Sequence, residues 1–558
     1  MKALFRIFSK LKFFSPGRKK KKTPGKKEKT GLPVDYRDIS QREEDFKKAP
    51  LVADLERNLR TIMEITGNSY DLSIKKCQIG PEKVPAAVIF IDGMIEKFAI
   101  ENLLQALKLE TFKTGIDGIN KKEIFATLLN SLLTEISREA DDIQTLYEGV
   151  SQGETALLFD GTAKAILCET RGWSLRTIVE PENESAIRAP REGFVESVRV
   201  NTSLIRRRIR SPNLWIENLY VGSLTRTEVA FAYIKGLAGE EFLEELRSRL
   251  KRIDIDGILE SGVVEEFIRD APFSLFPTVF RTERPDRVAS AILEGRVAIF
   301  TNGTPFVLVV PADLLMMLQA PDDYFEIFPI GLFLRILRFI SFLLSFFLPG
   351  IYVALLNFHP ELVPITLLLR IQAAREGVPF PVVAEVLLME ATFEILREAG
   401  VRLPRAVGAA ITIVGALILG DAAIRAGIVS PGVVIIVAFT AIASFTSPVF
   451  SLALTARLIR FGMIFLGALI GLLGIQFGLL VLIVHLVSMR SFGYPYMAPF
   501  GPLIWQDMKD AVIRGFWWKQ TYRPRLLGFR EPLRQRPGQM PRPPRKSNYS
   551  DKNGGKDE

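Results

Sequence analysis

The spacing of apolar residues divides the chain into two regions of different periodicity. Up to about residue 320, short β-rich apolar runs alternate with longer runs of helical spacing, a pattern typical of an α/β region that folds in water. Beyond it the apolar runs become long, and residues 339–358 contain no charged side chain. A helix of about 20 apolar residues can cross the ~30 Å hydrocarbon core of a bilayer. The pattern predicts an α/β N-terminal region followed by an all-α multi-span membrane domain.

The N-terminal region contains two pairs of similar segments at nearly one offset. Residues 84–107 are similar to 227–250, each with an apolar strand, a glycine-containing turn and an amphipathic helix. Residues 155–169 are similar to 297–311, each with a strand, a turn and a returning strand. The latter turns carry strong hairpin signals, Asp160-Gly161-Thr162 and Asn302-Gly303-Thr304. The two matches predict two related subdomains in tandem, with chance similarity of common strand–turn patterns as the alternative.

A segment of helical character, residues 189–212, lies between the repeats. It gathers four closely spaced cations, Arg206, Arg207, Arg208 and Arg210. One interpretation is an exposed basic helix, which composition slightly favours. The other is a surface that contacts an acidic partner, a phosphate group or the membrane.

The helical region contains four to six predicted membrane segments. They lie near residues 332–358, 361–371, 379–398, 406–425, 428–450 and 461–487. With the patterns above, they divide the chain into a basic disordered tail (1–45), subdomain 1 (46–188), a basic connector helix (189–212), subdomain 2 (213–320), a transmembrane domain (321–508) and a basic Pro-rich tail (509–558).

The segment at 379–398 differs from the others because it is acidic. Glu390, Glu394 and Glu398 recur at every fourth residue and therefore share one helical face, opposite apolar residues. Such a helix suits a membrane interface or the wall of an aqueous cavity. For Glu385, Glu390, Glu394 and Glu398 the two interpretations are a solvated helix face and a cation-attracting wall of a pore or cavity, and the first three are the ion-path candidates.

A second pair of ionisable residues, Asp421 and Arg425, is four residues apart and can pair on one helical face. A charge within a membrane segment is costly unless it faces protein or water, so these residues are functional candidates. An anchoring pair at the membrane edge and a part of an ion path are equally weighted interpretations.

Charge is concentrated at the two ends of the chain. The net charge is +10, but residues 1–31 hold twelve Lys/Arg against one acid, and residues 509–558 hold thirteen against five. Basic tails beside a membrane attract anionic lipid head groups, and solvated tails that fix the orientation are a compatible alternative. The body of the chain between these tails carries no basic motif interleaved with aromatic residues, so nucleic acid is not an expected partner.

The placement of Lys and Arg also predicts topology. Arg335 and Arg338 precede the first span, and the N-terminus lacks the uninterrupted apolar core of a signal peptide, so the soluble region is expected in the cytoplasm. The basic C-terminal tail predicts the same side, which requires an even number of crossings. Arg457 and Arg460 conflict with this if residues 461–487 cross once.

The sequence carries no enzyme motif. It contains neither a Walker A loop nor an HExxH sequence, and its two histidines, His359 and His485, lie in or beside predicted membrane segments. Its two cysteines, Cys77 and Cys168, form no CxxC pair. We therefore expect no catalytic residue, no metal site and no cofactor.

Long stretches of the chain closely resemble the A subunit of GerA-type spore germinant receptors. The resemblance rests on residues 358–448, on PREGFVESVRVNTSLIRRRIRSPNL at 190–214, on HLVSMRSFGYPYMAPFGP at 485–502 and on the Arg/Pro-rich tail after RPRLLG at 523–528. It covers about residues 45–530 through long and specific motifs.

This resemblance implies a multi-pass protein of the inner membrane of endospores, with two related soluble subdomains facing the cytoplasm or spore core. It implies a transporter-like B subunit that binds the nutrient and a C-subunit lipoprotein as partners. It further implies a homo-oligomer acting as a ligand-gated cation channel that starts germination. The alternatives are the stage V sporulation paralogue of the same family, acting as an ion-release channel or scaffold without direct nutrient gating, and a secondary transporter. A transporter would need an inverted repeat, which the sequence does not show.

Overall fold

The computed structural model describes residues 49–79, 83–103, 137–172, 186–402, 420–527 and 532–541, with single residues at 42, 44, 46, 105, 180, 181 and 184. Several predicted features lie outside the described residues. These are the tail at 1–45 apart from positions 42 and 44, most of the membrane segment at 406–425, and the C-terminal tail from residue 542.

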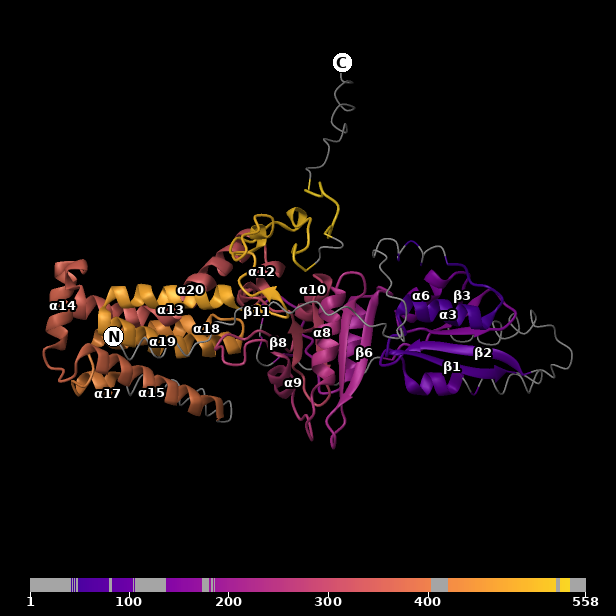
Figure 1. Cartoon of the computed structure of the whole chain (residues 1–558), viewed down its shortest axis with the longest axis horizontal. Helices are drawn as coiled ribbons and strands as arrows, with labels where there is room; N and C mark the ends of the chain where they lie inside the picture. The colour runs from indigo at the N-terminus through magenta and orange to yellow at the C-terminus, as the bar shows by residue number, and fades with distance from the viewer. Residues whose placement is uncertain are drawn as a thin grey trace, which may run out of the picture. The chain divides into compact units, whose positions relative to one another are not determined.

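The first subdomain is built on an antiparallel sheet with the strand order β1-β2-β4-β5-β3. Its strands are β1 (Leu72–Ile79), β2 (Val84–Ile91), β3 (Ser137–Ala140), β4 (Thr155–Phe159) and β5 (Ala165–Cys168). Helices α3 (Leu55–Thr66) and α6 (Ile143–Val150) cover one face (Figure 1). Because successive strand residues point to opposite faces, Ala87 and Ile89 of β2 pack in this core, whereas Val88 and Phe90 pack in the core on the other face.

The second subdomain repeats this plan with the strand order β6-β7-β9-β10-β8. Its strands are β6 (Leu214–Val221), β7 (Thr227–Ile234), β8 (Phe280–Thr282), β9 (Val297–Thr301) and β10 (Val307–Val310). Helices α7 (Val198–Arg208) and α10 (Pro285–Leu293) cover one face, and α8 (Glu240–Lys251) and α9 (Ser261–Ile268) cover the other. The core under α7 and α10 continues into the helical bundle through Phe342, Phe346 and Leu452.

The two sheets have equivalent strands in equivalent positions. β6 begins at residue 214 and β1 at residue 72, an offset of 142, and the same subtraction for β7 and β2 gives 143. The turns after β4 and β9 form the hairpins expected from their sequences, and Gly161 and Gly303 have φ values of +90° and +92° there. A shared strand order at a shared offset is the outcome that the sequence repeat predicts.

Helix α7 belongs to the second subdomain and is not a separate connector. It begins 143 residues after α3, at residue 198 against 55, and covers the equivalent face of its sheet. Val198, Leu204 and Ile205 are buried in the core of that subdomain. The predicted boundary at residues 189–212 is therefore corrected, because the run of arginines obscured the apolar face of the helix.

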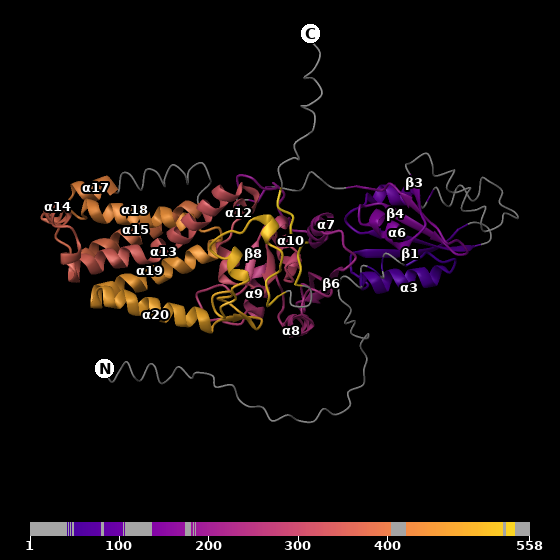
Figure 2. The same ribbon diagram turned by 90° about the horizontal axis from the view of Figure 1, so that it is seen from above.

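A helical bundle follows the second subdomain, after the short helices α11 (Leu314–Leu318) and α12 (Asp322–Phe325). Its helices are α13 (Phe328–Phe358), α14 (Ile365–Arg375), α15 (Val382–Arg402), α17 (Gly420–Arg425), α18 (Pro431–Phe445), α19 (Phe450–Ile470) and α20 (Leu472–Ser488). Helices α13 and α19 pack along each other, and α18 and α20 contact both of them (Figures 1 and 2). Within the described residues, α13 and α19 are the two helices long and apolar enough to cross a membrane, and α18 and α20 are shorter apolar helices. The multi-span arrangement stays a prediction.

The predicted single segment at residues 461–487 is two helices joined at Gly471. This residue adopts φ +70° and ψ −146°, a conformation open to glycine, and α20 turns back along α19 so that Gly474 lies against the carbonyl group of Leu466. The apolar run continues through the turn, so hydrophobicity alone could not locate it. The start of α13 and the end of α20 both adjoin the second subdomain, through Arg338 and His485. Residues 461–487 therefore do not form the single straight helix on which the conflict with Arg457 and Arg460 depended.

Helices α13 and α19 approach closely at two glycines. A Cβ atom at Gly467 would lie 2.5 Å from the carbonyl oxygen of Gly350, which is too close for any side chain. We therefore expect Gly467→Val to lower the free energy of unfolding by about 1–3 kcal/mol, the usual cost of overpacking. Thermal unfolding of the purified full-length protein in detergent measures the change. Gly462→Val in the same helix is the control, because a Cβ atom there meets nothing within 4 Å; equal effects of the two substitutions would contradict the expected close contact.

Candidate functional site

The glutamates of α15 point into the bundle, where they meet arginines. Glu385 has no exposed side-chain surface. Its Oε1 accepts a hydrogen bond of 3.0 Å from Nη2 of Arg375 in α14, and its Oε2 accepts one of 2.8 Å from the backbone N–H of Ser430, at the start of α18. The carboxylate thus ties together three helices at one end of the bundle.

Glu390, about one and a half turns further along α15, forms a buried ion pair with Arg460 of α19. Its Oε2 lies 2.5 Å from Nη1 of Arg460, and the side chains are 0% and 1% exposed. Nε of Arg460 donates a second hydrogen bond, of 2.7 Å, to the backbone carbonyl of Ser345 in α13. A charge buried this deeply is tolerated only when it is paired and hydrogen-bonded.

Glu394, one turn further, lies between two guanidinium groups. Arg397 and Arg457 each approach one of its carboxylate oxygens at 3.6 Å, a distance for an ion pair but too long for a hydrogen bond. Arg397 also donates a hydrogen bond of 2.9 Å to Oγ of Ser444 and lies over the rings of Phe393 and Phe445. We call Glu390, Glu394, Arg397, Arg457 and Arg460 the bundle charge cluster.

This arrangement differs from both sequence interpretations of the acidic face. Glu385 and Glu390 are fully buried, so they are not part of a solvated surface. The carboxylates of Glu385, Glu390 and Glu394 are paired with four guanidinium groups, those of Arg375, Arg397, Arg457 and Arg460. Together these seven side chains have a formal charge of +1. In this conformation the face is not a wall of free negative charge. Glu398 alone of the acidic face stays exposed, paired with Arg402.

The other predicted ion-path residues lie apart from this cluster. Asp421 and Arg425 form the expected pair within α17 at 2.9 Å, and their side chains are 56% and 79% exposed. They contribute a surface pair and, among the described residues, no contact with the bundle charge cluster.

The arginines of the cluster were missed because they are distant in sequence from the glutamates. Arg460 lies 70 residues beyond Glu390, and only the packing of α15 against α19 brings them together. A signal did exist: Arg457 and Arg460 are three apart inside the apolar helix α19, where two charges require a buried partner. Their use as topology markers hid this requirement.

The four clustered arginines, three at the end of α7 and Arg210 just beyond it, have three different environments. Arg206 is 3% exposed and bonds Asp71 of the first subdomain twice, at 2.6 and 2.9 Å, as well as Ser69 at 2.7 Å. Arg207 and Arg208 both pair with Glu192 and are each 20% exposed, and Arg210 is exposed. Arg206 therefore joins the two subdomains and presents no surface to a partner or to lipid.

The arginines at the start of α13 are buried as well. Arg335 has no exposed surface and pairs with Asp323 of α12 at 3.1 Å and with Asp510 of the C-terminal segment at 2.9 Å. Arg338 pairs with the same Asp323 at 2.9 Å. These residues fasten the bundle to the second subdomain and to the returning chain, whereas the sequence analysis used them only as markers of the cytoplasmic side.

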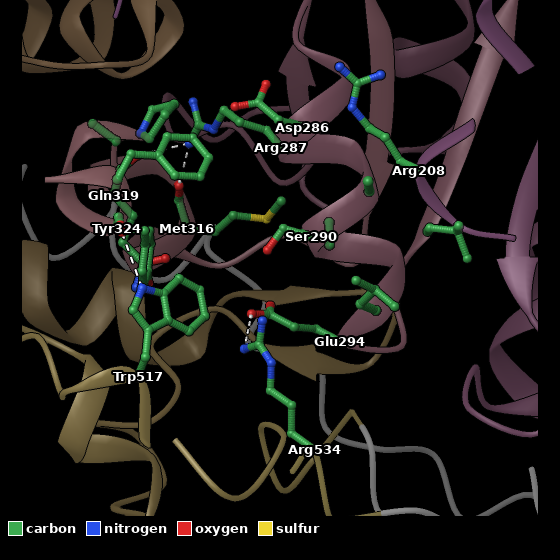
Figure 3. Close-up of a pocket in the computed structure, with 17 residues that line it drawn as sticks. Arg208, Asp286, Arg287, Ser290, Glu294, Met316, Gln319, Tyr324, Trp517 and Arg534 are labelled. Atoms are coloured by element: carbon green, nitrogen blue, oxygen red, sulfur yellow. Dashed lines mark hydrogen bonds and ion pairs between the residues drawn. The ribbon is translucent and has the colours of Figure 1, made fainter. Parts of the chain in front are cut away.

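A cavity of about 350 Å³ lies between α10, the α11–α12 segment and the C-terminal segment. Figure 3 shows Ser290, Met316 and Tyr324 around it, with Trp517 and the Glu294–Arg534 pair at its edge. Burial raises the pKa of Glu294, and the nearby guanidinium groups of Arg296 and Arg534 act against this shift. Trp517 donates its indole N–H to the backbone carbonyl of Tyr324. Because much of its wall is apolar and these polar groups already have partners, the cavity suits an apolar occupant.

Within the described ranges, no group of three or more His, Cys, Asp or Glu side chains is placed to hold a metal ion. The absence of a catalytic residue and of a cofactor stays a prediction.

Comparison with known proteins places most of the chain in one family. A family model for the Bacillus/Clostridium GerA spore germination protein matches residues 60–526. Spore germination protein KA of Bacillus subtilis (strain 168) is 44% identical over 492 residues, which cover 88% of this chain and 89% of that protein. Spore germination protein GerLA of Bacillus cereus is 36% identical over 468 residues, covering 83% and 94%.

One solved structure is also similar. It is the crystal structure of the N-terminal domain of the A subunit of the Bacillus megaterium spore germinant receptor GerK3. That domain is 36% identical, and the match covers 47% of this chain and 97% of the domain with a TM-score of 0.38.

Proposed function

This chain belongs to the Bacillus/Clostridium GerA family of spore germination proteins, and from that premise we propose that it is the A subunit of a spore germinant receptor. In this proposal it lies in the inner spore membrane with its soluble subdomains in the cytoplasm or core. Its partners are a transporter-like B subunit and a lipoprotein C subunit, and several copies assemble into a ligand-gated cation channel.

The observation that carries the membrane part of the proposal is the inverted distribution of side chains in the bundle. Large apolar side chains point outward, such as Ile340 at 50%, Phe465 at 55% and Leu480 at 59% exposure. Charged side chains point inward, such as Glu390 and Arg460. An apolar surface this extensive is typical of contact with lipid and is rare on soluble monomers.

The charge pairs support a closed state of the proposed channel. Glu385, Glu390 and Glu394 are the ion-path candidates on α15, and each is engaged by an arginine. Cations would meet negative charge only after these pairs separate. We therefore propose that opening moves α15 relative to α14 and α19, while Asp421 and Arg425 line the path at the surface of α17.

Ion flux from liposomes tests this proposal. The full-length protein is reconstituted with its B and C subunits, and release of entrapped K⁺ is followed after nutrient addition. We expect nutrient-dependent flux that Glu390→Gln and Glu394→Gln change at least severalfold, because each removes a negative charge from the proposed path. Glu398→Gln is the control, because this residue is exposed and pairs with the likewise exposed Arg402.

The outcomes separate the alternative functions. Absence of flux from an assembled complex would overturn the channel and favour a scaffold. Flux without any dependence on the nutrient or on the B subunit would favour the stage V sporulation paralogue. Flux that is stoichiometrically coupled to transport of a second solute would favour a secondary transporter.

A further inference from the structure

Among the described residues, six buried polar atoms of the bundle charge cluster have no hydrogen-bond partner. They are Oε1 of Glu390, Oε1 of Glu394, Nε and Nη1 of Arg397, Nε of Arg457 and Nη2 of Arg460. Each unsatisfied buried group costs about 1–3 kcal/mol, and more when it is charged. Nη1 of Arg397 and Oε1 of Glu394 face each other at 3.6 Å, and the six atoms include more donors than acceptors, so a further hydrogen-bond acceptor is needed to satisfy the guanidinium nitrogens.

Donors and positive charge are in excess in this cluster. Four of the six atoms are guanidinium nitrogens and two are carboxylate oxygens. Glu390 pairs with Arg460, and Glu394 pairs with both Arg397 and Arg457. Glu390 and Glu394 are one turn apart on α15, and Arg457 and Arg460 are one turn apart on α19, so these groups adjoin one another. With two carboxylates and three guanidinium groups, the formal charge is +1. A species that accepts hydrogen bonds and carries one negative charge satisfies both conditions, and a cation satisfies neither.

We propose that the bundle charge cluster binds one small monovalent anion, such as chloride, between α15 and α19. Glu390 and Ser345 hold the guanidinium group of Arg460 in place, and Nη2 of Arg460 stays available for the anion. Ser444 holds Arg397 through Nη2, so that Nε and Nη1 of Arg397 stay available. Arg397 and Arg460 are 8% and 1% exposed, so the anion is shielded from bulk water.

The depth of the cluster distinguishes a free ion from a lipid phosphate, which has the same charge. Arg457 and Arg460 are seven and ten residues after the start of α19 at Phe450, about 10–15 Å along the helix. The head-group layer lies at the helix ends, so a free ion is the source that we propose. Within the proposed receptor, the bound anion would hold the arginines together and stabilise the closed state. The site itself does not depend on channel activity.

Thermal unfolding of the full-length protein in lipid-free detergent tests the site. Sodium chloride replaces sodium gluconate at constant ionic strength, so that only the identity of the anion changes. We expect chloride to raise Tm in a saturable manner, since a ligand that binds only the folded state stabilises it. Broadening of the ³⁵Cl resonance by the protein, reversed by bromide, is the direct measurement of binding.

Two substitutions with opposite effects make the test specific. Glu394→Gln raises the charge of the cluster to +2 and should lower the half-saturating chloride concentration by about tenfold or more. Arg397→Gln should abolish both the Tm shift and the line broadening. Arg402→Gln, on the exposed end of the same helix, should change neither.

Several results would overturn the proposal. An equal Tm in chloride and gluconate without ³⁵Cl broadening would mean that water satisfies the unpaired atoms. Weaker chloride binding in Glu394→Gln would exclude an electrostatic anion site. A chloride effect that appears only after lipid is added back would assign the arginines to a lipid phosphate. None of these measurements uses ion flux, so failure here is distinguishable from failure of the proposed channel.

Discussion

Replacing Arg460 by leucine lowers the free energy of unfolding by about 3–5 kcal/mol, because it leaves the carboxylate of Glu390 buried without its counter-charge. Both side chains are essentially unexposed, and Nη1 of Arg460 lies 2.5 Å from Oε2 of Glu390. The substitution also removes the hydrogen bond to the carbonyl of Ser345 in α13. Thermal unfolding of the full-length protein in detergent measures the loss.

A double substitution separates the charge effect from the packing effect. Glu390→Leu combined with Arg460→Leu removes both charges, and buried ion pairs are often replaceable by apolar residues at little cost. The double variant should therefore recover most of the lost stability, while Arg402→Gln, at an exposed pair, changes it by less than about 1 kcal/mol. If the double variant were as unstable as the single one, the loss would come from packing and not from an uncompensated charge.

Replacing Arg206 by methionine should be comparably severe, at about 3–5 kcal/mol, because Asp71 loses its buried partner. Asp71 is 4% exposed and receives two hydrogen bonds from this guanidinium group, which also binds Ser69 beside the edge strand β6. Ser69 in turn accepts a hydrogen bond from the backbone N–H of Ile216 in β6. The contact between the two subdomains should therefore weaken first.

Hydrogen exchange locates this second effect. In Arg206→Met, the amides of Tyr70 and Ile216, which are bonded across the two subdomains, should exchange faster than those of β9 within one sheet. Arg208→Met is the control, because Arg208 forms a partly exposed pair with Glu192 in its own subdomain. Uniformly faster exchange throughout β9 would show that Arg206 stabilises the second subdomain itself and not the joint.

The sequence was informative wherever a local pattern decides the structure. Two related sheets were predicted from the paired turns at Gly161 and Gly303 and from the offset of 142–143 residues. This prediction was possible because the residues that form a hairpin turn and the alternation of a strand are set within a few positions of the sequence. The resemblance to the GerA family, based on long motifs, is confirmed by the match to residues 60–526. The apolar runs located the bundle.

Long-range packing could not be predicted in the same way. The glutamates of α15 were recognised as unusual, but their partners on α14 and α19 depend on how the helices are packed. Periodicity placed Arg206 in a basic helix. It could not show that the guanidinium group would form a buried ion pair with Asp71, which lies 135 residues earlier in the chain. The turn at Gly471 was hidden because a single glycine interrupts neither the hydrophobicity nor the charge pattern.

The turn at Gly471 has a practical consequence for labelling. Since α13 begins and α20 ends beside the second subdomain, a bundle that spans a bilayer would bring the returning chain out on the face where it entered. A fluorescent reporter attached after residue 541 would then share a compartment with the two sheets. An impermeant thiol reagent applied to the opposite face would reach a cysteine placed at the exposed Leu473, two residues after Gly471, and leave Cys77 unmodified.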